Sequence, residues 1–555
     1  MRRDYGLILI LFLLCLAVYF NSLNNGFVYD DEFLVANNRL ITSSKFLPQI
    51  FTSSLYEHSG FDERASFDKM YRPLQLVTYG IDYRIWKLAP FGFRLTNILL
   101  HLLNAFFVFY LLRLISHNIT ASFLASVLFL VHPAQASVVS YIAGRADLLA
   151  GFFILLSAVT FFRFIELKRR GYYFLILLCA CLALLSRENA LTLCIFLALI
   201  LSFFKAQLRQ YLYIIPFLLL NLGYLLLRFA IFGSNGLTLH DPLISAPFRL
   251  LNFLYISGRY ILVLLFPVDL HIFRSVPFIS SAWDVRIVSI AVFLLIGGIV
   301  LYKLRKNRLA WFGVGWFFTG IIPVFFFMDG YRALNQAVMA ESWLYLSCAG
   351  FFVIIVLIAD RLRKAGRALL IIFIIFLCVF TAIYNAYWKD DITLFRNALK
   401  YASAENPVRK NLINAYFRHG RYKDALDEIK KLAGYYPNEA QIYILWGNRF
   451  FAARRFNAAI DTYNISLSKT KDFYVVYYNL SACYAGLKQV DKAIGWGLEC
   501  FKLLPSYLPN LIQLGDLYVQ VKDFKEASIY YRMALELDPH SQLLKERMEE
   551  CKKNI

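Results

Sequence analysis

The stretch MRRDYGLILILFLLCLAVYFNSLNNGFVYDDEFLVANN, residues 1–38, joins an apolar segment to three consecutive acidic residues. Residues 6–22 carry no charge and approach the length that a helix needs to cross a bilayer. Arg2 and Arg3 precede this segment and no A-x-A-like cleavage site follows it. We therefore expect a retained first helix with its N-terminus in the cytoplasm, rather than a signal peptide that is removed.

The acidic triplet Asp30, Asp31 and Glu32 follows this helix at once. Adjacent carboxylates repel one another, and water beside a membrane solvates them only partly. A bound cation, a basic partner or a reaction that needs a base would each explain why the chain keeps them there.

Composition extends the membrane interpretation to the whole chain. Of its 555 residues 59% are hydrophobic, with 52 Phe and 36 Tyr, which is typical of a polytopic membrane protein. The net charge of +21 comes with short basic clusters between apolar runs, which is a topology signal. We therefore expect no nucleic-acid partner.

Apolar runs and basic clusters together predict the topology. Eleven runs are suitable for spanning: 6–22, 93–115, 119–134, 147–166, 172–186, 190–204, 211–231, 285–302, 309–327, 343–359 and 368–386. The basic clusters all fall on one side only if a further run, 250–266, makes no net crossing. We expect about eleven spans, with residues 250–286 re-entrant or lying on the outer surface. The loop 23–92 and the chain after residue 388 then both face outward.

The C-terminal part of the chain carries an internal repeat. Alanines recur every 34 residues, and aromatic residues keep the same step: Ala425, Ala459, Ala493 and Ala527, with Tyr416, Phe450, Tyr484 and Tyr518. This period is the tetratricopeptide signature. We predict an all-α protein whose membrane domain, residues 1–387, is followed by a repeat solenoid, residues 388–555, of about four repeats and a capping helix. Such solenoids present a concave surface to peptides, so this one either recruits a substrate or serves as a scaffold.

Arginines recur at the outward ends of the predicted spans, against the positive-inside bias. They include Arg72, Arg145 and Arg187, and later in the chain Arg259 and Arg332. A lipid-linked phosphate at the outer leaflet would explain them, since guanidinium groups match phosphate oxygens in bidentate geometry. A nearby carboxylate, Asp30 or Asp31, could then act as general base on an acceptor hydroxyl. This combination indicates glycosyl transfer from a polyprenyl-phosphate sugar.

Each of these positions also has a structural interpretation. Asp30 and Asp31 could cap a helix, Arg145 could pair with Asp147, and Arg187 with Glu188 could satisfy a hairpin. Elsewhere, His101 lies on a polar stripe that interhelical hydrogen bonds would explain, His132 lies at a helix end, and Glu341 could pair with Arg332 across a short loop. No spacing in the chain resembles a metal site.

Several segments resemble the transmembrane and tetratricopeptide-repeat protein O-mannosyltransferases and their bacterial relatives. They are FVYDDEFLVANN (27–38), YRPLQLVTYGIDY (71–83), LFLVHPAQASVVSYIAGRADLLA (128–150) and ESWLYLS (341–347). The resemblance implies a GT-C-type helix bundle with its active site under the first outward loop. It also implies transfer of a monosaccharide, mannose in eukaryotic members, from a polyprenyl-phosphate donor to protein Ser or Thr with inversion.

The resemblance assigns roles to the residues above. Asp30 and Asp31 match the catalytic acidic pair, and the first three arginines named above become candidates for holding the donor phosphate. Supporting positions are Glu32, His101, His132, Asp147, Glu188 and Glu341. The chain departs from the family pattern at Gln135, Ser137 and Ser342, where His, Glu and Arg are common.

Two other functions remain open from the sequence: a membrane-anchored scaffold of a cell-envelope complex, and an oligosaccharide ligase or polymerase. The ligase is disfavoured because its long outward loop usually comes late in the membrane domain, whereas here it comes first. For the transferase we expect no separate cofactor, a lipid-linked sugar and an acceptor protein as partners. The compact length favours a bacterial inner membrane with the site facing the periplasm, or the ER lumen in a eukaryote.

Overall fold

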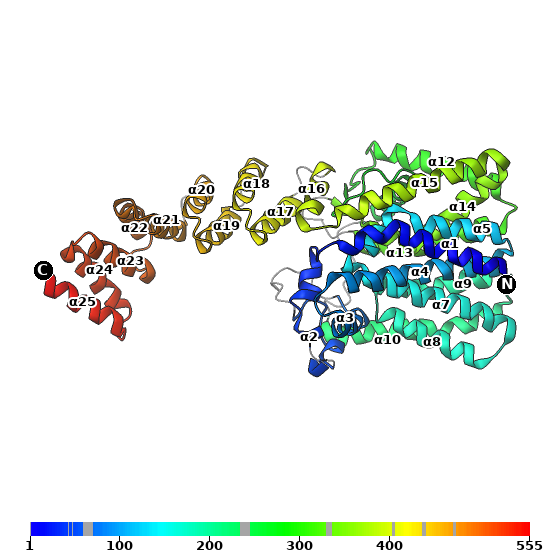
Figure 1. The fold of residues 1–555 in the computed structure, drawn as a ribbon, viewed down its shortest axis with the longest axis horizontal. Helices are drawn as coiled ribbons and strands as arrows, with labels where there is room; N and C mark the ends of the chain where they lie inside the picture. Colours follow the sequence, from blue (N-terminus) through cyan, green and yellow to red (C-terminus); the bar gives the residue numbers. More distant parts are fainter. Residues whose placement is uncertain are drawn as a thin grey trace. The chain divides into compact units, whose positions relative to one another are not determined.

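The computed structural model describes residues 2–42, 44–46, 48–58, 70–233, 245–328, 336–401, 406–435, 440–469 and 473–555 (Figure 1). These residues are helical apart from loops and one antiparallel ribbon, in which β1 (Ser275–Pro277) pairs with β2 (Gln336–Val338). They separate into two compact units, residues 1–401 and 402–555. The first unit extends past the predicted boundary at residue 387 because α16 (Asp391–Tyr401) packs on it: Asn397 donates to the Leu270 carbonyl at 3.1 Å.

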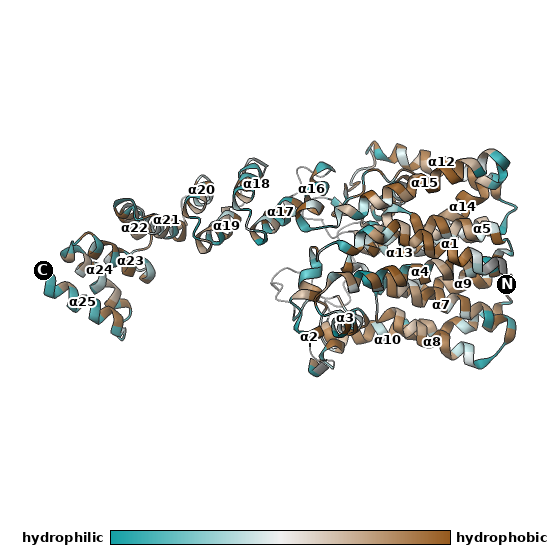
Figure 2. Ribbon diagram, in the orientation of Figure 1, coloured by the Kyte–Doolittle hydropathy of each residue, from teal (hydrophilic) through white to brown (hydrophobic). Residues whose placement is uncertain are grey.

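The first unit is built from apolar helices of differing length, which Figure 2 colours brown over most of their length. They are α1 (Arg2–Tyr19), α3 (Pro73–Trp86), α4 (Pro90–Ser116), α5 (Ile119–Val131), α7 (Arg145–Leu167), α8 (Arg170–Leu184), α9 (Leu193–Phe203), α10 (Ile215–Phe232), α11 (Ala246–Leu265), α12 (Arg286–Leu304), α13 (Arg308–Phe327), α14 (Ser347–Arg361) and α15 (Arg363–Tyr387).

Short helical turns connect them. They are η1 (Phe20–Asn24), η2 (Glu32–Ala36), α2 (Arg39–Thr42), η3 (Ser44–Phe46), η4 (Gln49–Phe51), η5 (Pro133–Gln135), α6 (Ala136–Val139), η6 (Ile142–Gly144), η7 (Glu188–Thr192), η8 (Leu208–Ile214) and η12 (Glu341–Leu344). The first and last long helices lie side by side, since Asn385 of α15 donates to the Val18 carbonyl of α1 at 2.8 Å (Figure 1).

Eight of the described helices are long and apolar enough to cross a bilayer, or nine if α5 and the segment Pro133–Val139 form one span bent by 52°. The chain is therefore an integral membrane protein, and the predicted fold class is confirmed. The number of spans by this criterion is smaller than the eleven predicted, because α8, α9 and α14 are short. A helix of 15 residues, the length of α8 and α14, is only about 22 Å long, less than the thickness of the hydrocarbon core.

The segment predicted to make no net crossing forms the continuous helix α11, which counts among the eight. Its flanks nevertheless reach the same end of the bundle. Arg228, near the end of α10, pairs with Glu188 at 3.4 Å, and Glu188 pairs with Arg72 at 3.2 Å. Arg274, which follows α11, lines one cavity together with Arg72. This geometry favours an α11 that makes no net crossing of the membrane. A count of spans from helix length and composition alone is therefore too high at this helix.

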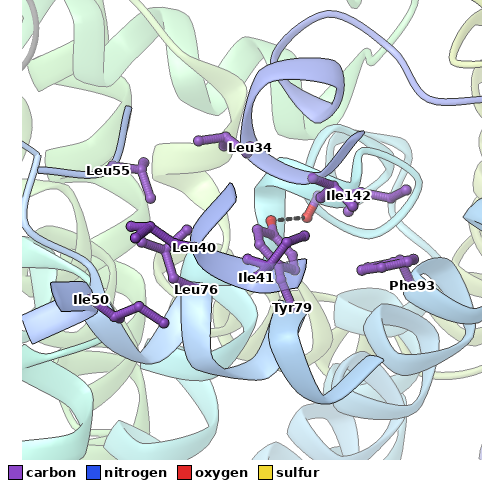
Figure 3. Close-up of a cluster of buried hydrophobic side chains, with 10 residues drawn as sticks. Leu34, Leu40, Ile41, Ile50, Leu55, Leu76, Tyr79, Phe93 and Ile142 are labelled. Carbon is purple, nitrogen blue, oxygen red and sulfur yellow. Dashed lines mark hydrogen bonds between the residues drawn. The ribbon is translucent and has the colours of Figure 1, made fainter. Parts of the chain in front are cut away.

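A small apolar core holds the loop that follows α1 (Figure 3). It brings together side chains of η2, α2, α3, α4 and η6: Leu34, Leu40, Ile41, Leu76, Tyr79, Phe93 and Ile142, with Val35, Ile50 and Leu55. The Tyr79 hydroxyl also donates to the Ile142 carbonyl at 2.8 Å. Each fully buried side chain of this size stabilises the folded state by about 1.5–3 kcal/mol. This apolar core thus holds in place the loop that carries the acidic triplet.

The second unit contains four helix pairs and a final helix, as the period of 34 predicts. The pairs are α17 (Asn406–Arg418) with α18 (Tyr422–Tyr435), α19 (Ala440–Ala452) with α20 (Phe456–Leu467), α21 (Tyr474–Gly486) with α22 (Val490–Leu503), and α23 (Leu508–Gln520) with α24 (Phe524–Leu537). The four recurring alanines are fully buried. The capping helix α25 (Gln542–Asn554) buries Leu544, Met548 and Cys551 in the core that α23 and α24 form.

Candidate active site

A cavity of about 340 Å³ opens where the first loop meets the helix ends of the first unit. Its wall combines distant parts of the chain: the first loop, the α6–α7 junction, the turn before η7, the segment after α11, η12 and the end of α15. Its lining residues include Tyr29, Asp30, Tyr56, Arg72, Ser137, Tyr141, Gly144, Asp147, Arg187, His271, Arg274, Glu341, Ser342, Tyr384 and Trp388.

Asp30 is the member of the acidic triplet that lines the cavity. The Tyr141 hydroxyl donates to its Oδ2 at 2.7 Å. Burial raises the pKa of Asp30 to about 6, although the hydrogen bonds from Tyr141 and Tyr56 and the charge of Arg72 act in the opposite direction. A carboxylate with a pKa near the working pH is suited to accept a proton and release it again.

Asp31 faces away from the cavity and is fully buried. Its carboxylate accepts hydrogen bonds from the backbone N–H groups of Val28, at 3.1 Å, and Ala143, at 2.8 Å. Burial raises its pKa to about 7, and the charge of Arg94 opposes that shift. Asp31 therefore ties the first loop to the α6–α7 junction, and of the two acids predicted as candidates for the base it is the one that does not line the cavity.

Arg94 strengthens the same attachment. Its guanidinium donates to the carbonyls of Asn25 and Gly26 in the first loop, and to the Ser140 carbonyl at 2.8 Å. Close packing at the junction requires Gly144, because a Cβ there would lie 2.3 Å from the Val138 carbonyl oxygen. The loop that carries Asp30 is thus attached to α4 through Arg94 and to the α6–α7 junction through Asp31.

Arg72 and Arg187 both line the cavity. Arg72 donates to Glu188 at 3.2 Å, Arg228 lies 3.4 Å from the same carboxylate, and Arg187 pairs with Asp147. Three guanidinium groups thus face two carboxylates. The Arg72 charge is close enough to act on Asp30.

Arg145 does not reach the cavity. Its side chain is fully buried and donates to Asp82 at 2.7 Å, to the Phe93 carbonyl at 2.7 Å and to Asn97. The predicted contact with a donor phosphate has no geometric support, and neither has the alternative pair with Asp147, since Asp147 binds Arg187. Arg145 is instead part of a sealed ion pair.

Four of the supporting positions also lie outside the cavity lining: His101, His132, Glu32 and Glu188. His101 contacts the Tyr345 hydroxyl and the Leu130 carbonyl, each at 3.0 Å, on the polar stripe of α4. His132 accepts from the Ala134 N–H at 3.2 Å and caps η5. Glu32 starts η2 and is not a lining residue. For the two histidines the structural interpretation from the sequence fits these contacts.

Glu341 lies in another part of the cavity wall. It accepts from the His271 N–H and the Tyr384 hydroxyl, each at 2.9 Å, and its carboxylate is 3.5 Å from Arg274. Burial raises the pKa of Glu341 to about 7, against the charge of Arg274. The cavity therefore holds two carboxylates with raised pKa values, Asp30 and Glu341.

The departures from the family pattern meet in this region. Ser137 of α6 and Ser342 of η12 both line the cavity, and these two short helices pack on each other. Gln135 is buried and donates to the Tyr345 carbonyl at 3.3 Å and to Cys348 Sγ at 3.0 Å. The wall at this point carries hydroxyl groups and no charge from these three positions.

Several residues that complete the site could not be selected from the sequence. Tyr56 and Tyr141 hold Asp30, Arg228 shares Glu188, and Arg274 and Tyr384 hold Glu341. Tyrosine is so common in this chain that no spacing singles out these three. The position of Arg228 near the outward end of a predicted span was the one usable signal.

Comparison with known proteins finds distant homologues over most of the chain. It is 28% identical to a protein O-mannosyl-transferase of Caenorhabditis elegans over 76% of this chain and 62% of the relative. It is 23% identical to the mouse protein O-mannosyl-transferase TMTC3 over 94% of this chain and 63% of the relative. The mouse protein O-mannosyl-transferase TMTC4 is 26% identical over 72% and 62%. The chain thus spans slightly less than two thirds of the length of these relatives.

The second unit has matches of its own. The family described as tetratricopeptide repeat matches residues 508–541, which cover α23 and α24. Among solved structures, the crystal structure of MamA is 24% identical and covers 27% of this chain and 86% of its own, with a TM-score of 0.24. The chain is therefore a membrane protein related to protein O-mannosyltransferases, and it carries a tetratricopeptide repeat.

Proposed function

We propose that this protein is a membrane glycosyltransferase that moves a monosaccharide, with mannose as the first candidate, from a polyprenyl-phosphate donor to a protein Ser or Thr hydroxyl. The observation that carries the proposal is the meeting of Asp30 with Arg72 and Arg187 around one cavity. The distant homologues named as protein O-mannosyl-transferases support it.

The chemistry follows from the three side chains. Asp30 takes the proton of the acceptor hydroxyl while the hydroxyl oxygen attacks the anomeric carbon of the sugar. The bond between that carbon and the phosphate oxygen breaks, and the phosphate leaves with its electron pair. Arg72 and Arg187 stabilise the charge that develops on the leaving phosphate. A single displacement of this kind inverts the anomeric configuration.

The decisive experiment is a transfer assay in membranes, with polyprenyl-phosphate mannose as donor and a Ser/Thr-containing peptide as acceptor. Asp30→Asn keeps the size of the side chain and removes the base, so transfer should fall on the order of 100-fold or more. Asp284→Asn is the matched control, because Asp284 is an acid before α12 that does not line the cavity. Wild-type transfer by Asp30→Asn would refute the assignment.

The cavity opens on the end of the bundle that carries the first loop, which the basic clusters predict to face outward. We propose the periplasmic side of a bacterial inner membrane, or the ER lumen in a eukaryote. A reporter fused after residue 400 that is active only in the cytoplasm would contradict this orientation.

We assign recruitment of the acceptor protein to residues 402–555. Removing this unit should raise the KM for a protein acceptor and leave the KM for a short peptide acceptor unchanged, since the peptide needs no second docking site. Equal effects on both acceptors would favour a purely structural role. The scaffold function alone would leave the cavity and its two raised carboxyl pKa values without a purpose.

A further inference from the structure

A second cavity lies at the opposite end of the bundle from the candidate active site. It has a volume of about 730 Å³ and is bounded by the end of α7, the end of α9 and the turn η8. Ile165 lines it, while Asp147, at the other end of α7, lines the first cavity. At 1.5 Å per residue these two positions are about 27 Å apart along α7, close to the thickness of a hydrocarbon core.

The wall of this cavity is basic and polar on one side. Lys205, Gln207, Arg209 and Gln210 line it, and no acidic residue is among its described lining residues. Neither Lys205 nor Arg209 has an ion-pair partner within the part of the chain that the structure describes. A third cation is near, since the Lys168 ammonium lies 5.7 Å from the ring centre of Tyr213, which also lines the cavity.

The other side of the wall is apolar and continues onto an exposed apolar surface. Ile165, Leu201, Phe204 and Leu212 line the cavity. Leu212 is 57% exposed, and Leu208, next to Arg209, is 86% exposed. Side chains of this kind are stable at such exposure in the acyl region of a bilayer, whereas the neighbouring charges require the headgroup layer. The cavity therefore lies across the boundary between the two.

We propose that this cavity binds the headgroup of an anionic glycerophospholipid. Lys205 and Arg209 neutralise its phosphate, Gln207 and Gln210 offer hydrogen bonds to the polar headgroup, and the acyl chains lie along the apolar side that Leu208 and Leu212 extend. Basic pockets between membrane helices are a recurring form of lipid recognition. The site involves neither the acceptor nor the donor of the proposed transfer.

The test uses the full chain in nanodiscs with equal amounts of phosphatidylglycerol and phosphatidylcholine, followed by native mass spectrometry of the lipids that stay bound. The wild type should retain phosphatidylglycerol in preference. The double variant Lys205→Gln, Arg209→Gln should bind it roughly 30-fold more weakly. Each of the two basic residues contributes about equally to the electrostatic attraction for the anionic headgroup, and the variant loses both contributions. Thermal unfolding in each lipid shows whether the variant is folded.

The matched control is Arg361→Gln, Lys364→Gln, which removes the same charge from exposed positions at the end of α14 and the start of α15, outside the cavity. It should retain the wild-type preference. Three results would each overturn the proposal: no preference for phosphatidylglycerol in the wild type, equal loss in the control, or unchanged binding in the double variant. Competition by inorganic phosphate at micromolar concentration would assign the site to free phosphate instead of a lipid.

Discussion

Arg145 and Asp147 lie two residues apart at the start of α7, yet they belong to different regions of the molecule. Arg145 pairs with Asp82 in a sealed interior where its side chain is fully buried. Asp147 pairs with Arg187 at the cavity wall. Residues at i and i+2 of a helix are about 200° apart around its axis and therefore face opposite ways. One Arg–Asp ion pair thus stabilises the interior on one face of α7, and a second Arg–Asp ion pair lines the cavity on the other face.

The sharpest way to break this comparison is to remove each arginine in turn. Arg145→Ala leaves the Asp82 carboxylate buried without its partner, so the free energy of unfolding should fall by about 3–5 kcal/mol. Solubilised protein should show a much lower melting temperature, or little folded protein should be recovered. A variant with unchanged melting temperature would mean that Arg145 is not the structural member of the two.

Arg72→Ala tests the cavity side, where the loss should appear in donor use rather than in folding. A charged hydrogen bond to the donor phosphate contributes about 1.5–3 kcal/mol, so kcat/KM for the donor should fall roughly 10–100-fold. The measurement is a titration with polyprenyl-phosphate sugar at saturating acceptor. The KM for the acceptor serves as the internal control and should stay within a factor of about two.

Arg187→Lys sharpens the same point with a smaller change. It keeps the positive charge opposite Asp147 but loses the planar fork that matches phosphate oxygens. We expect about tenfold lower kcat/KM for the donor with an unchanged melting temperature. If Lys restores full activity, charge alone is enough at this position.

The smallest expected effect is on the pH profile. The pKa of Asp30 is raised to about 6, and the base must be unprotonated to accept the hydroxyl proton. Activity should therefore be lost as the pH falls through 6, by about tenfold between pH 7 and pH 5. The limb of the profile should shift in Tyr141→Phe, which removes the hydrogen bond that favours the ionised form of Asp30. An identical limb in both proteins would assign the titration to another group.

The fold was largely predictable because its signals are periodic. The period of 34 located four helix pairs, and the apolar runs located the long helices of the first unit. The boundary at α16 was not predictable, because that helix has the polar pattern of a soluble segment and packs on the membrane unit only through particular contacts such as that of Asn397. Helix length also changed the number of spans, since apolar runs do not show where a helix bends or ends.

The candidate site was predictable in part. Asp30, Arg72 and Arg187 stood out because charges beside a membrane are costly and need a reason. The sequence alone could not show which of the two adjacent acids faces the cavity, since this depends on the backbone N–H groups of Val28 and Ala143. Arg145 satisfied the same sequence criterion as Arg187. Only the face of α7 on which Arg145 lies keeps its side chain away from the cavity.

The order in which the wall is made has a consequence for biogenesis. Tyr384 donates to Glu341, and Trp388 stacks on Tyr141 with 4.9 Å between ring centres, so the end of α15 supports the partners of both cavity carboxylates. At ordinary translation rates roughly 20–70 s pass between synthesis of Asp30 and synthesis of Trp388. The nascent protein thus carries an unfinished pocket until α15 is synthesised, and the proposed transfer requires that this helix be inserted.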